Sequence, residues 1–265
     1  MSFADKFSNL GAPGRVWAVS AVHDSLAALQ ALHAALFERL SPGDRLVYTG
    51  NYLAAENPVE TIDELLHFRR SLLSCGGVQA QDIVYLRGAA EDLWEKILCL
   101  QFNISPRQAL EWVATHHPAT ARAIAGYGGS FAEGFSAIAG GIPCIARWTA
   151  QLRTAQNAHP GHDKFFSSLR RAAFTEKEGG NNILFVHAGV DPSLPLTEQG
   201  DNFFWAYRKF SDMPGPYAPF RAVVRGADPE FKGLVVGPGS VSLGGAHLTC
   251  AEMNGDGDIL NILAA

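Results

Sequence analysis

Polar side chains follow directly after three short apolar runs in the first third of the chain. Residues 16–22, 45–49 and 82–86 are rich in β-branched and aromatic residues, which is typical of buried strands. The loops after them hold the polar side chains His23, Asp24, Asn51, Tyr52, Arg87 and Glu91. Active sites of α/β folds lie at the carboxyl ends of strands, so these loops are where chemistry is expected. Further along, His187 follows another apolar run, and histidines combined with carboxylates are ligands for a divalent metal ion.

Five segments, taken in order, resemble the signatures of the calcineurin-like metallophosphoesterases, in the bacterial serine/threonine protein phosphatase (phosphoprotein phosphatase) branch. They are residues 20–24, 50–56, 87–91, 185–192 and 235–239. In that family the corresponding segments read GDxHG, GDxxDRG, GNHE, HGG or HAG, and GH followed by Ser or Thr. The alternative is an ordinary α/β domain with chance matches. The resemblance implies an α/β fold, a metallophosphoesterase-type four-layer α/β/β/α sandwich with a helical insert, over one domain of residues 1–265.

The resemblance also implies where metal ligands would lie. The family holds two divalent metals, which activate a water and neutralise the phosphate during an in-line displacement. The ligating histidines of the first and fourth segments are present as His23 and His187. The other four ligand positions hold residues that are weak donors or none: Ala21, Asn51, Ala89 and Pro238. Only these two histidines therefore remain as strong metal ligands.

The family's other catalytic side chains are missing as well. Ala54 and Ala55 stand where the second segment carries an Asp and the phosphate-binding Arg, and Glu56 replaces its Gly. Ala90 stands where the third segment carries the general-acid His, although Glu91 after it is kept. The resemblance therefore implies that both the charge that binds phosphate and the proton donor for the leaving group are lost.

A binuclear centre also needs negative ligands to offset its own charge. Two dications about 4 Å apart repel each other by about 17 kcal/mol at an effective dielectric of about 20. Both ligating carboxylates of the family are absent, and the neutral amide of Asn51 is a poor substitute because hard divalent ions prefer charged oxygen ligands. The sequence therefore predicts no binuclear centre and no cofactor.

A rebuilt single-metal site is the alternative for this region. His23 and His187 with one carboxylate would make a set of two histidines and one carboxylate, which is a known metal site. Four carboxylates lie near the vacated positions: Asp24, Glu56, Glu91 and Asp191. The competing interpretation is that the two histidines are buried, hydrogen-bonded relics, and without a demonstrated third ligand the sequence favours it.

The small side chains at the vacated positions leave space for a ligand other than a metal. The candidate pocket residues are Asp24, Tyr52, Arg87 and Glu91. A structural ion pair between Arg87 and Glu91 is the alternative interpretation of those two. Seven histidines match no family segment and are expected on the surface or on helix faces: His33, His67, His116, His117, His159, His162 and His247.

Periodicity predicts the elements that position the first three loops. Leucines at helical spacing predict helices over residues 26–40 and 59–73. With the three strands they make a β-α-β-α-β unit, which implies parallel pairing.

The rest of the chain is expected to be an irregular tail over residues 1–14, a helical insert over about 91–175, and strands at 183–186 and 233–237. The final residues read as a hairpin around the turn 254–257, whose Asn and Asp residues resemble the start of a calcium loop without its final Glu. The aromatic residues of the insert are expected in its core: Phe102, Trp112, Phe131, Phe135, Trp148, Phe165 and Phe166.

Composition limits the function classes. The formal net charge of -5 is spread along the chain with no run of Lys and Arg, so nucleic acid is not an expected partner. No stretch approaches the roughly 20 apolar residues of a membrane span, and the four cysteines form no CxxC pair. We therefore expect a cytoplasmic protein without a membrane partner.

These observations predict a catalytically inactive phosphatase-fold protein, a pseudophosphatase, with a binding, regulatory or scaffolding role toward an unknown protein or a small phosphorylated ligand. One competing hypothesis is a residual metal-dependent phosphoesterase, acting on phosphomonoesters or phosphoproteins through the single-metal site on His23 and His187. Another is a purely structural subunit of a larger assembly, which exposed aromatic residues on the insert would favour.

Overall fold

The computed structural model describes residues 6–205, 215–230 and 232–264, and within them the chain forms two mixed sheets. The first sheet has the strand order β11-β10-β2-β3-β4, with bounds β2 Arg15–Val19, β3 Arg45–Tyr48, β4 Ile83–Tyr85, β10 Thr249–Asn254 and β11 Ile259–Ala264. The second sheet has the order β1-β5-β6-β7-β9-β8, with bounds β1 Phe7–Asn9, β5 Ala172–Phe174, β6 Asn182–Val186, β7 Phe220–Arg225, β8 Val235–Gly237 and β9 Ser240–Ser242.

The predicted β-α-β-α-β unit is confirmed. Strands β2, β3 and β4 pair in parallel, and α2 (Leu26–Phe37) and α3 (Pro58–Ser74) connect them. Helix α2 begins because the Ser25 side chain accepts a hydrogen bond from the backbone of Ala28, and α3 begins at a proline whose fixed φ suits the first helical turn. Of the leucines that recur at helical spacing, α2 buries Leu29, Leu32 and Leu36.

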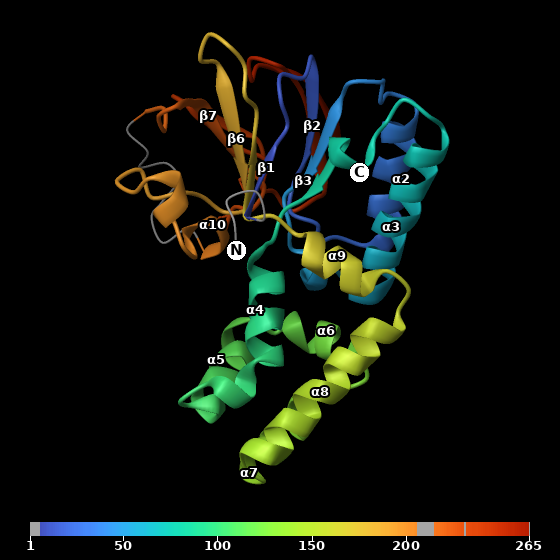
Figure 1. Cartoon of the computed structure of the whole chain (residues 1–265), viewed down its shortest axis with the longest axis vertical. Coiled ribbons are helices and arrows are strands. Elements are labelled where there is room, and N and C mark those ends of the chain that lie inside the picture. Colours follow the sequence, from blue (N-terminus) through green and yellow to red (C-terminus); the bar gives the residue numbers. More distant parts are fainter. Residues whose placement is uncertain (1–5, 206–214, 231, 265) are drawn as a thin grey trace.

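The two sheets pack face to face and share one apolar layer. Side chains from β2, β3, β4 and β10 meet side chains from β6, β7 and β9 in this layer. Helices α2 and α3 cover the outer face of the first sheet, and the short α10 (Asn202–Trp205) packs on the outer face of the second, as Figure 1 shows. This arrangement confirms the predicted four-layer sandwich of metallophosphoesterase type.

The insert is helical, as expected, and extends away from the sheets (Figure 1). Its helices are α4 Ala89–Leu98, α5 Pro106–His116, α6 Thr120–Gly126, α7 Phe131–Ala139, α8 Ile142–Ala158 and α9 His162–Ser168. The aromatic residues divide between core and surface: Trp148 and Phe165 are buried, whereas Phe102 is 80% exposed and Trp112 46% exposed. The expectation that all of them lie in the core was wrong, because the extended insert has too little volume to bury every apolar side chain.

Three local expectations fail in the second sheet. Part of the supposed irregular tail forms β1, which pairs in parallel with β5. The segment expected as a buried strand at 233–237 contains only the short β8, an edge strand whose Val236 is 64% exposed. The strand that lies beside β6 is β7, which the sequence interpretation missed.

The expected hairpin at the chain end is confirmed by the antiparallel pairing of β10 with β11. In its turn the Asn254 side chain accepts hydrogen bonds from the backbone of Asp256 and Asp258, which is the local bonding of a turn residue. All four cysteines are free thiols. Within the described ranges, no helix combines the length and apolar character needed to cross a membrane.

Candidate functional site

The carboxyl ends of the parallel strands from both sheets meet at one edge of the sandwich, here called the strand-end edge. The backbone of Ala21, after β2, donates to Gly226 O, after β7, at 2.9 Å. The backbone of Val22 donates to Gly50 O, after β3, at 2.8 Å. The sheets approach closely here: a Cβ on Gly226 would lie 1.6 Å from Thr49 Oγ1, so only glycine fits.

The two retained histidines both lie at the strand-end edge. His187 is buried, and its Nδ1 lies 2.6 Å from Thr49 O, which gives the Nδ1 proton an acceptor. His23 is half-buried, with its Nδ1 2.8 Å from Ala21 O. The pKa of His187 is lowered to about 4, chiefly by burial; charge repulsion from His23 acts in the same direction, and the hydrogen bond with Thr49 O opposes both. At neutral pH His187 is therefore a neutral, hydrogen-bonded side chain.

Asn51 is engaged in holding the start of α4. It adopts a left-handed backbone conformation, with φ of 68°, which Asn tolerates better than most residues. Its Oδ1 accepts from the backbone N–H of Ala90 at 3.1 Å, so the amide caps the amino end of the helix. Gly88 has to be glycine, since a Cβ there would lie 2.4 Å from the backbone nitrogen of Asn51. The oxygen that would face a metal is therefore already bonded to the protein.

Glu91 holds the same loops together from inside. Its buried carboxylate accepts three backbone N–H groups, from Asn51 at 2.9 Å, Leu53 at 2.9 Å and Gly88 at 2.8 Å. Burial raises the pKa of Glu91, and the three N–H donors partly offset this rise. The expected alternative of an Arg87–Glu91 ion pair is wrong, because Arg87 pairs with the exposed Glu95 one turn further along α4.

The loop with the two alanines is held by an arginine from the insert. Arg122 of α6 donates from Nη2 to Ala54 O at 2.7 Å and from Nε to Ala55 O at 3.0 Å. Ala55 is fully buried, so its side chain is covered by the rest of the protein. A guanidinium therefore lies at this loop, but it binds backbone carbonyls.

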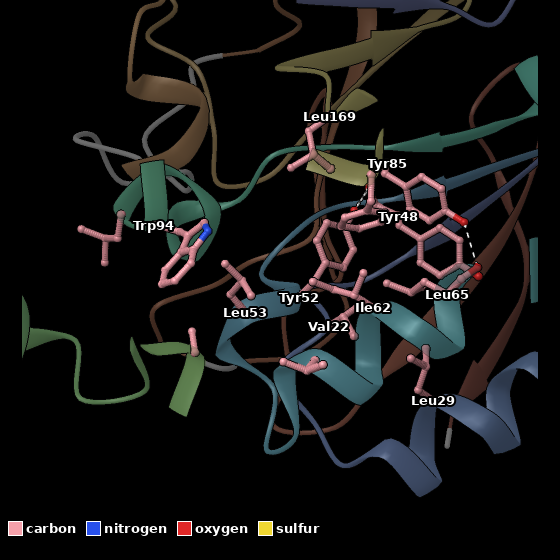
Figure 2. Packing of buried hydrophobic residues seen from close by; sticks show 14 of the residues in the cluster. Val22, Leu29, Tyr48, Tyr52, Leu53, Ile62, Leu65, Tyr85, Trp94 and Leu169 are labelled. Carbon is pink, nitrogen blue, oxygen red and sulfur yellow. Dashed lines mark hydrogen bonds between the residues drawn. The ribbon is translucent and has the colours of Figure 1, made fainter. Parts of the chain in front are cut away.

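Two of the four candidate pocket residues are located differently from expectation. Tyr52 is fully buried in the core, where it packs edge-on against Tyr85 and its hydroxyl donates to Tyr48 O, as Figure 2 shows. Its ring also packs edge-on against Phe165. The left-handed Asn51 turns the chain so that this ring points inward. Asp24 accepts from the backbone of Ser25 at 2.7 Å and Leu248 at 3.1 Å. Its carboxylate therefore joins the start of α2 to the start of β10.

Pro238 is not at the strand-end edge, and its place in the site is corrected. Gly239 O accepts from Val223 in the middle of β7, so Pro238 lies toward the amino end of that strand. The hollow formed there by Gly237 and its neighbours also includes Asp256 of the terminal hairpin turn. At the carboxyl end of β7 the chain instead presents Ala227, whose N–H donates to His187 O at 2.8 Å. The sequence signal was the short apolar run 222–224, followed by Arg225 and Gly226.

These residues do not fit the binuclear centre that the fold family implies. Beside His23 and His187, the strand-end positions offer alanines and an Asn whose oxygen is bonded to the backbone. The carboxylates of Asp24 and Glu91 each accept two or more backbone donors, and Asp191 Oδ1 accepts from the backbone and hydroxyl of Ser193. Glu56 is exposed on the loop.

Of the seven histidines expected on the surface or on helix faces, His33 and His162 lie on helix faces that are buried. His33 is stacked on Phe68, with Nδ1 2.6 Å from Glu64 Oε1 and Nε2 2.9 Å from the Tyr48 hydroxyl. His162 is fully buried at the start of α9. Spacing alone could not show this, because the burial depends on acidic and tyrosine partners that are distant in sequence.

Comparisons with known proteins support the fold. No family model matches the chain, and no curated protein matches it. A solved structure of a candidate diadenosine tetraphosphatase is similar, with 15% identity, a TM-score of 0.52 and 98% of each chain covered. A protein serine/threonine phosphatase from Saccharomyces cerevisiae, with similarity to human phosphatase PP5, covers 92% of this chain and 76% of its own, with 13% identity and a TM-score of 0.43. The first of these likenesses, at a TM-score of 0.52, supports the metallophosphoesterase-type phosphatase fold described above.

Proposed function

We propose that this protein is a catalytically inactive member of the phosphatase fold that acts by binding, in a regulatory or scaffolding role. The observation that carries the proposal is the bonding at the strand-end edge. Asn51 Oδ1 and the Glu91 carboxylate, which belong to the loops after β3 and β4, accept hydrogen bonds from backbone N–H groups of those loops. An atom that holds a loop in this way is not free to bind a metal or a substrate.

The missing side chains support the same conclusion. Phosphoester hydrolysis in this fold needs charge next to the phosphate and a proton donor for the leaving oxygen. Ala54, Ala55, Ala89 and Ala90 provide neither, and the nearby guanidinium of Arg122 is bonded to the carbonyls of the loop. Losing a general acid alone typically reduces a rate by roughly 100- to 10,000-fold.

The residual single-metal phosphoesterase is the weaker hypothesis. His23 and His187 both lie at the strand-end edge, where each has its Nδ1 beside a backbone carbonyl oxygen. The third ligand is what the site lacks, because Asp24, Glu91 and Asp191 are engaged in hydrogen bonds within the protein. Among the described residues at the strand-end edge, none therefore favours this function over binding.

Hydrolysis assays test the proposal directly. The parent protein and a His23→Ala/His187→Ala double variant are assayed with added Mn²⁺ on an aryl phosphate, a phosphoserine peptide and diadenosine tetraphosphate, the last suggested by the solved neighbour. We expect both proteins to show the same background rate. Manganese-dependent turnover by the parent that disappears in the double variant would overturn the proposal and establish the single-metal alternative.

The binding role needs a separate measurement. Calorimetric titration of the parent with the phosphoserine peptide and with diadenosine tetraphosphate asks whether a phosphorylated ligand is held without being hydrolysed. Saturable binding without turnover would support a sensor of phosphorylated ligands. If neither ligand binds, a protein partner remains the proposed ligand.

A further inference from the structure

A second group of potential metal ligands lies away from the strand-end edge, where α3 of the sandwich meets the insert. It consists of Asp63 on α3, His159 at the end of α8 and His162 at the start of α9, here called the α3–α9 cluster. One ligand atom from each residue lies within 4.8 Å of the others. Among the described residues, this is the one group of three or more His, Cys, Asp or Glu side chains with such spacing.

The local sequence explains how the two histidines come together. His159 and His162 flank the pair Pro160-Gly161, and Gly161 has a φ of 90°, which lets the chain turn sharply between α8 and α9. As a result the two imidazole rings stack, with their centroids 4.9 Å apart and their planes inclined by 26°. This short turn places both imidazoles beside Asp63.

A tyrosine orients the buried histidine. The Tyr127 hydroxyl lies 2.8 Å from His162 Nδ1, and His162 Nε2 lies 3.1 Å from Asp63 Oδ1. A histidine that binds metal through one nitrogen almost always has its other nitrogen hydrogen-bonded, which fixes the ring and its tautomer. Tyr127 provides that support here, because Nδ1–H can donate to its oxygen while the Nε2 lone pair faces the carboxylate.

The surroundings favour a cation and give it access. The Asp63 side chain is 52% exposed, so the cluster opens to solvent on that side. The adjoining hollow is lined by Glu60, Asp63, Glu64, His67 and Arg70 of α3, together with Leu26, Gln30 and Pro160. Three carboxylates against one arginine leave this side with an excess of negative charge, which attracts divalent cations to the opening.

We propose that the α3–α9 cluster is a binding site for a divalent transition metal of the zinc class, held by Asp63, His159 and His162. Two imidazoles and a carboxylate suit such an ion, which binds N and O ligands at about 2.0–2.2 Å. The ligand atoms have to move together by small side-chain rotations, and the carboxylate on the exposed side has room to do so. The fourth position faces solvent, where a water molecule or a ligand atom completes a tetrahedral shell.

The position of the site gives the metal a structural consequence. Asp63 belongs to the sandwich, whereas Tyr127 and His159 belong to the insert. A metal bound between them cross-links the insert to α3. Because the ion binds the folded arrangement and not the unfolded chain, its binding energy adds to the free energy of unfolding.

Metal titration of the full chain tests the proposal. The protein is stripped with chelator and titrated with Co²⁺, whose visible absorption reports tetrahedral coordination, and with Zn²⁺ by calorimetry. We expect one ion per chain, a melting temperature that rises with Zn²⁺, and affinity at least about tenfold weaker in Asp63→Asn and His159→Gln. Tyr127→Phe is expected to lower the affinity by roughly 10- to 100-fold without removing a ligand.

Matched controls separate this site from other histidines. His247→Gln alters an exposed histidine elsewhere and is expected to leave the affinity unchanged. His187→Gln is expected to leave it unchanged as well. Absence of saturable binding, or equal affinity in the parent, Asp63→Asn and His159→Gln, would overturn the proposal. Binding that is lost only in His187→Gln would overturn it too, and would place the metal at the strand-end edge.

Discussion

Truncating Glu91 should destabilise the protein more than the loss of one hydrogen bond would, because its carboxylate accepts three backbone N–H groups. Glu91→Ala leaves three backbone N–H groups, those of Asn51, Leu53 and Gly88, without their acceptor in a buried setting. An unsatisfied buried donor costs about 1–3 kcal/mol, and water entering the vacated space relieves part of that. We therefore expect a loss of about 3–5 kcal/mol in the free energy of unfolding.

Glu91→Gln should give an intermediate result. The amide oxygen can replace Oε2, which accepts from both Asn51 and Gly88, while the amide nitrogen then faces the N–H of Leu53. Two of the three donors keep an acceptor, so the expected loss is about 1–2 kcal/mol.

Urea unfolding followed by circular dichroism measures these differences, with the slope of the transition checked for a change in the unfolded state. Glu95→Ala is the matched control, because Glu95 lies on the same helix and is exposed. Within the described residues, its one ion pair is with Arg87. Its loss should be about 0–1 kcal/mol. If Glu91→Ala and Glu95→Ala lose the same stability, the three backbone bonds do not hold the loops as argued.

Three further predictions follow from the strand-end edge. The pKa of His187 is about 4 in the folded protein, against an ordinary value of 6.5. As the pH falls, the unfolded chain therefore takes up this proton before the folded protein does. The contribution of His187 to the free energy of unfolding is fully present above pH 6.5 and should fall by about 3 kcal/mol toward pH 4. Unfolding curves of His187→Gln over this range should lack that component. Arg122→Ala should lower the free energy of unfolding by about 1–2 kcal/mol, because it loses two hydrogen bonds to backbone carbonyls. Arg107→Ala loses only an exposed ion pair and should change the free energy little when measured by the same urea unfolding. With the α3–α9 cluster removed, Ala227→His should bind Co²⁺ at least about tenfold more tightly than Pro238→His, and equal affinities would contradict the corrected location.

The sequence predicted best the parts of the fold that depend on local periodicity. Helix α2 buries three of the leucines that recur at helical spacing, Leu29, Leu32 and Leu36, and β2, β3 and β4 lie within the predicted apolar runs or begin one residue before them. The terminal hairpin followed from its Asn-Gly turn. These elements depend on residues that are close in sequence, so one sequence is enough to predict them.

Elements that depend on distant partners were missed. Strand β1 is a three-residue segment containing Ser and Asn, and it is a strand because β5 provides its hydrogen bonds. The run Val235-Val236 looks like a core strand by composition, yet it lies at the edge of the second sheet and is exposed. The motif resemblance drew attention to Gly237-Pro238, whereas the topology places Gly226-Ala227 beside His187.

The candidate site followed a similar division. Sequence reasoning found His23, Asn51 and His187 from their places after strands, and the structure brings the loops that carry them together. It could not show that Tyr52 turns into the core or that Glu91 accepts three backbone donors. Those features depend on one left-handed residue and on loops that come together only in the folded chain.

The hydrogen bonds at the strand-end edge connect the stability of this protein to its proposed inactivity. A metal centre needs ligand atoms that face an open depression, whereas here Asn51 Oδ1 caps α4 and the Glu91 carboxylate ties two loops together. Restoring an aspartate at position 51 would supply a charged ligand, but that carboxylate is also favoured at the amino end of a helix. The helix and the metal would then compete for the same oxygen. We therefore expect recovery of metal binding to require loosening these loops as well as replacing the missing residues, so that the proposed inactivity follows from the way the site is held together.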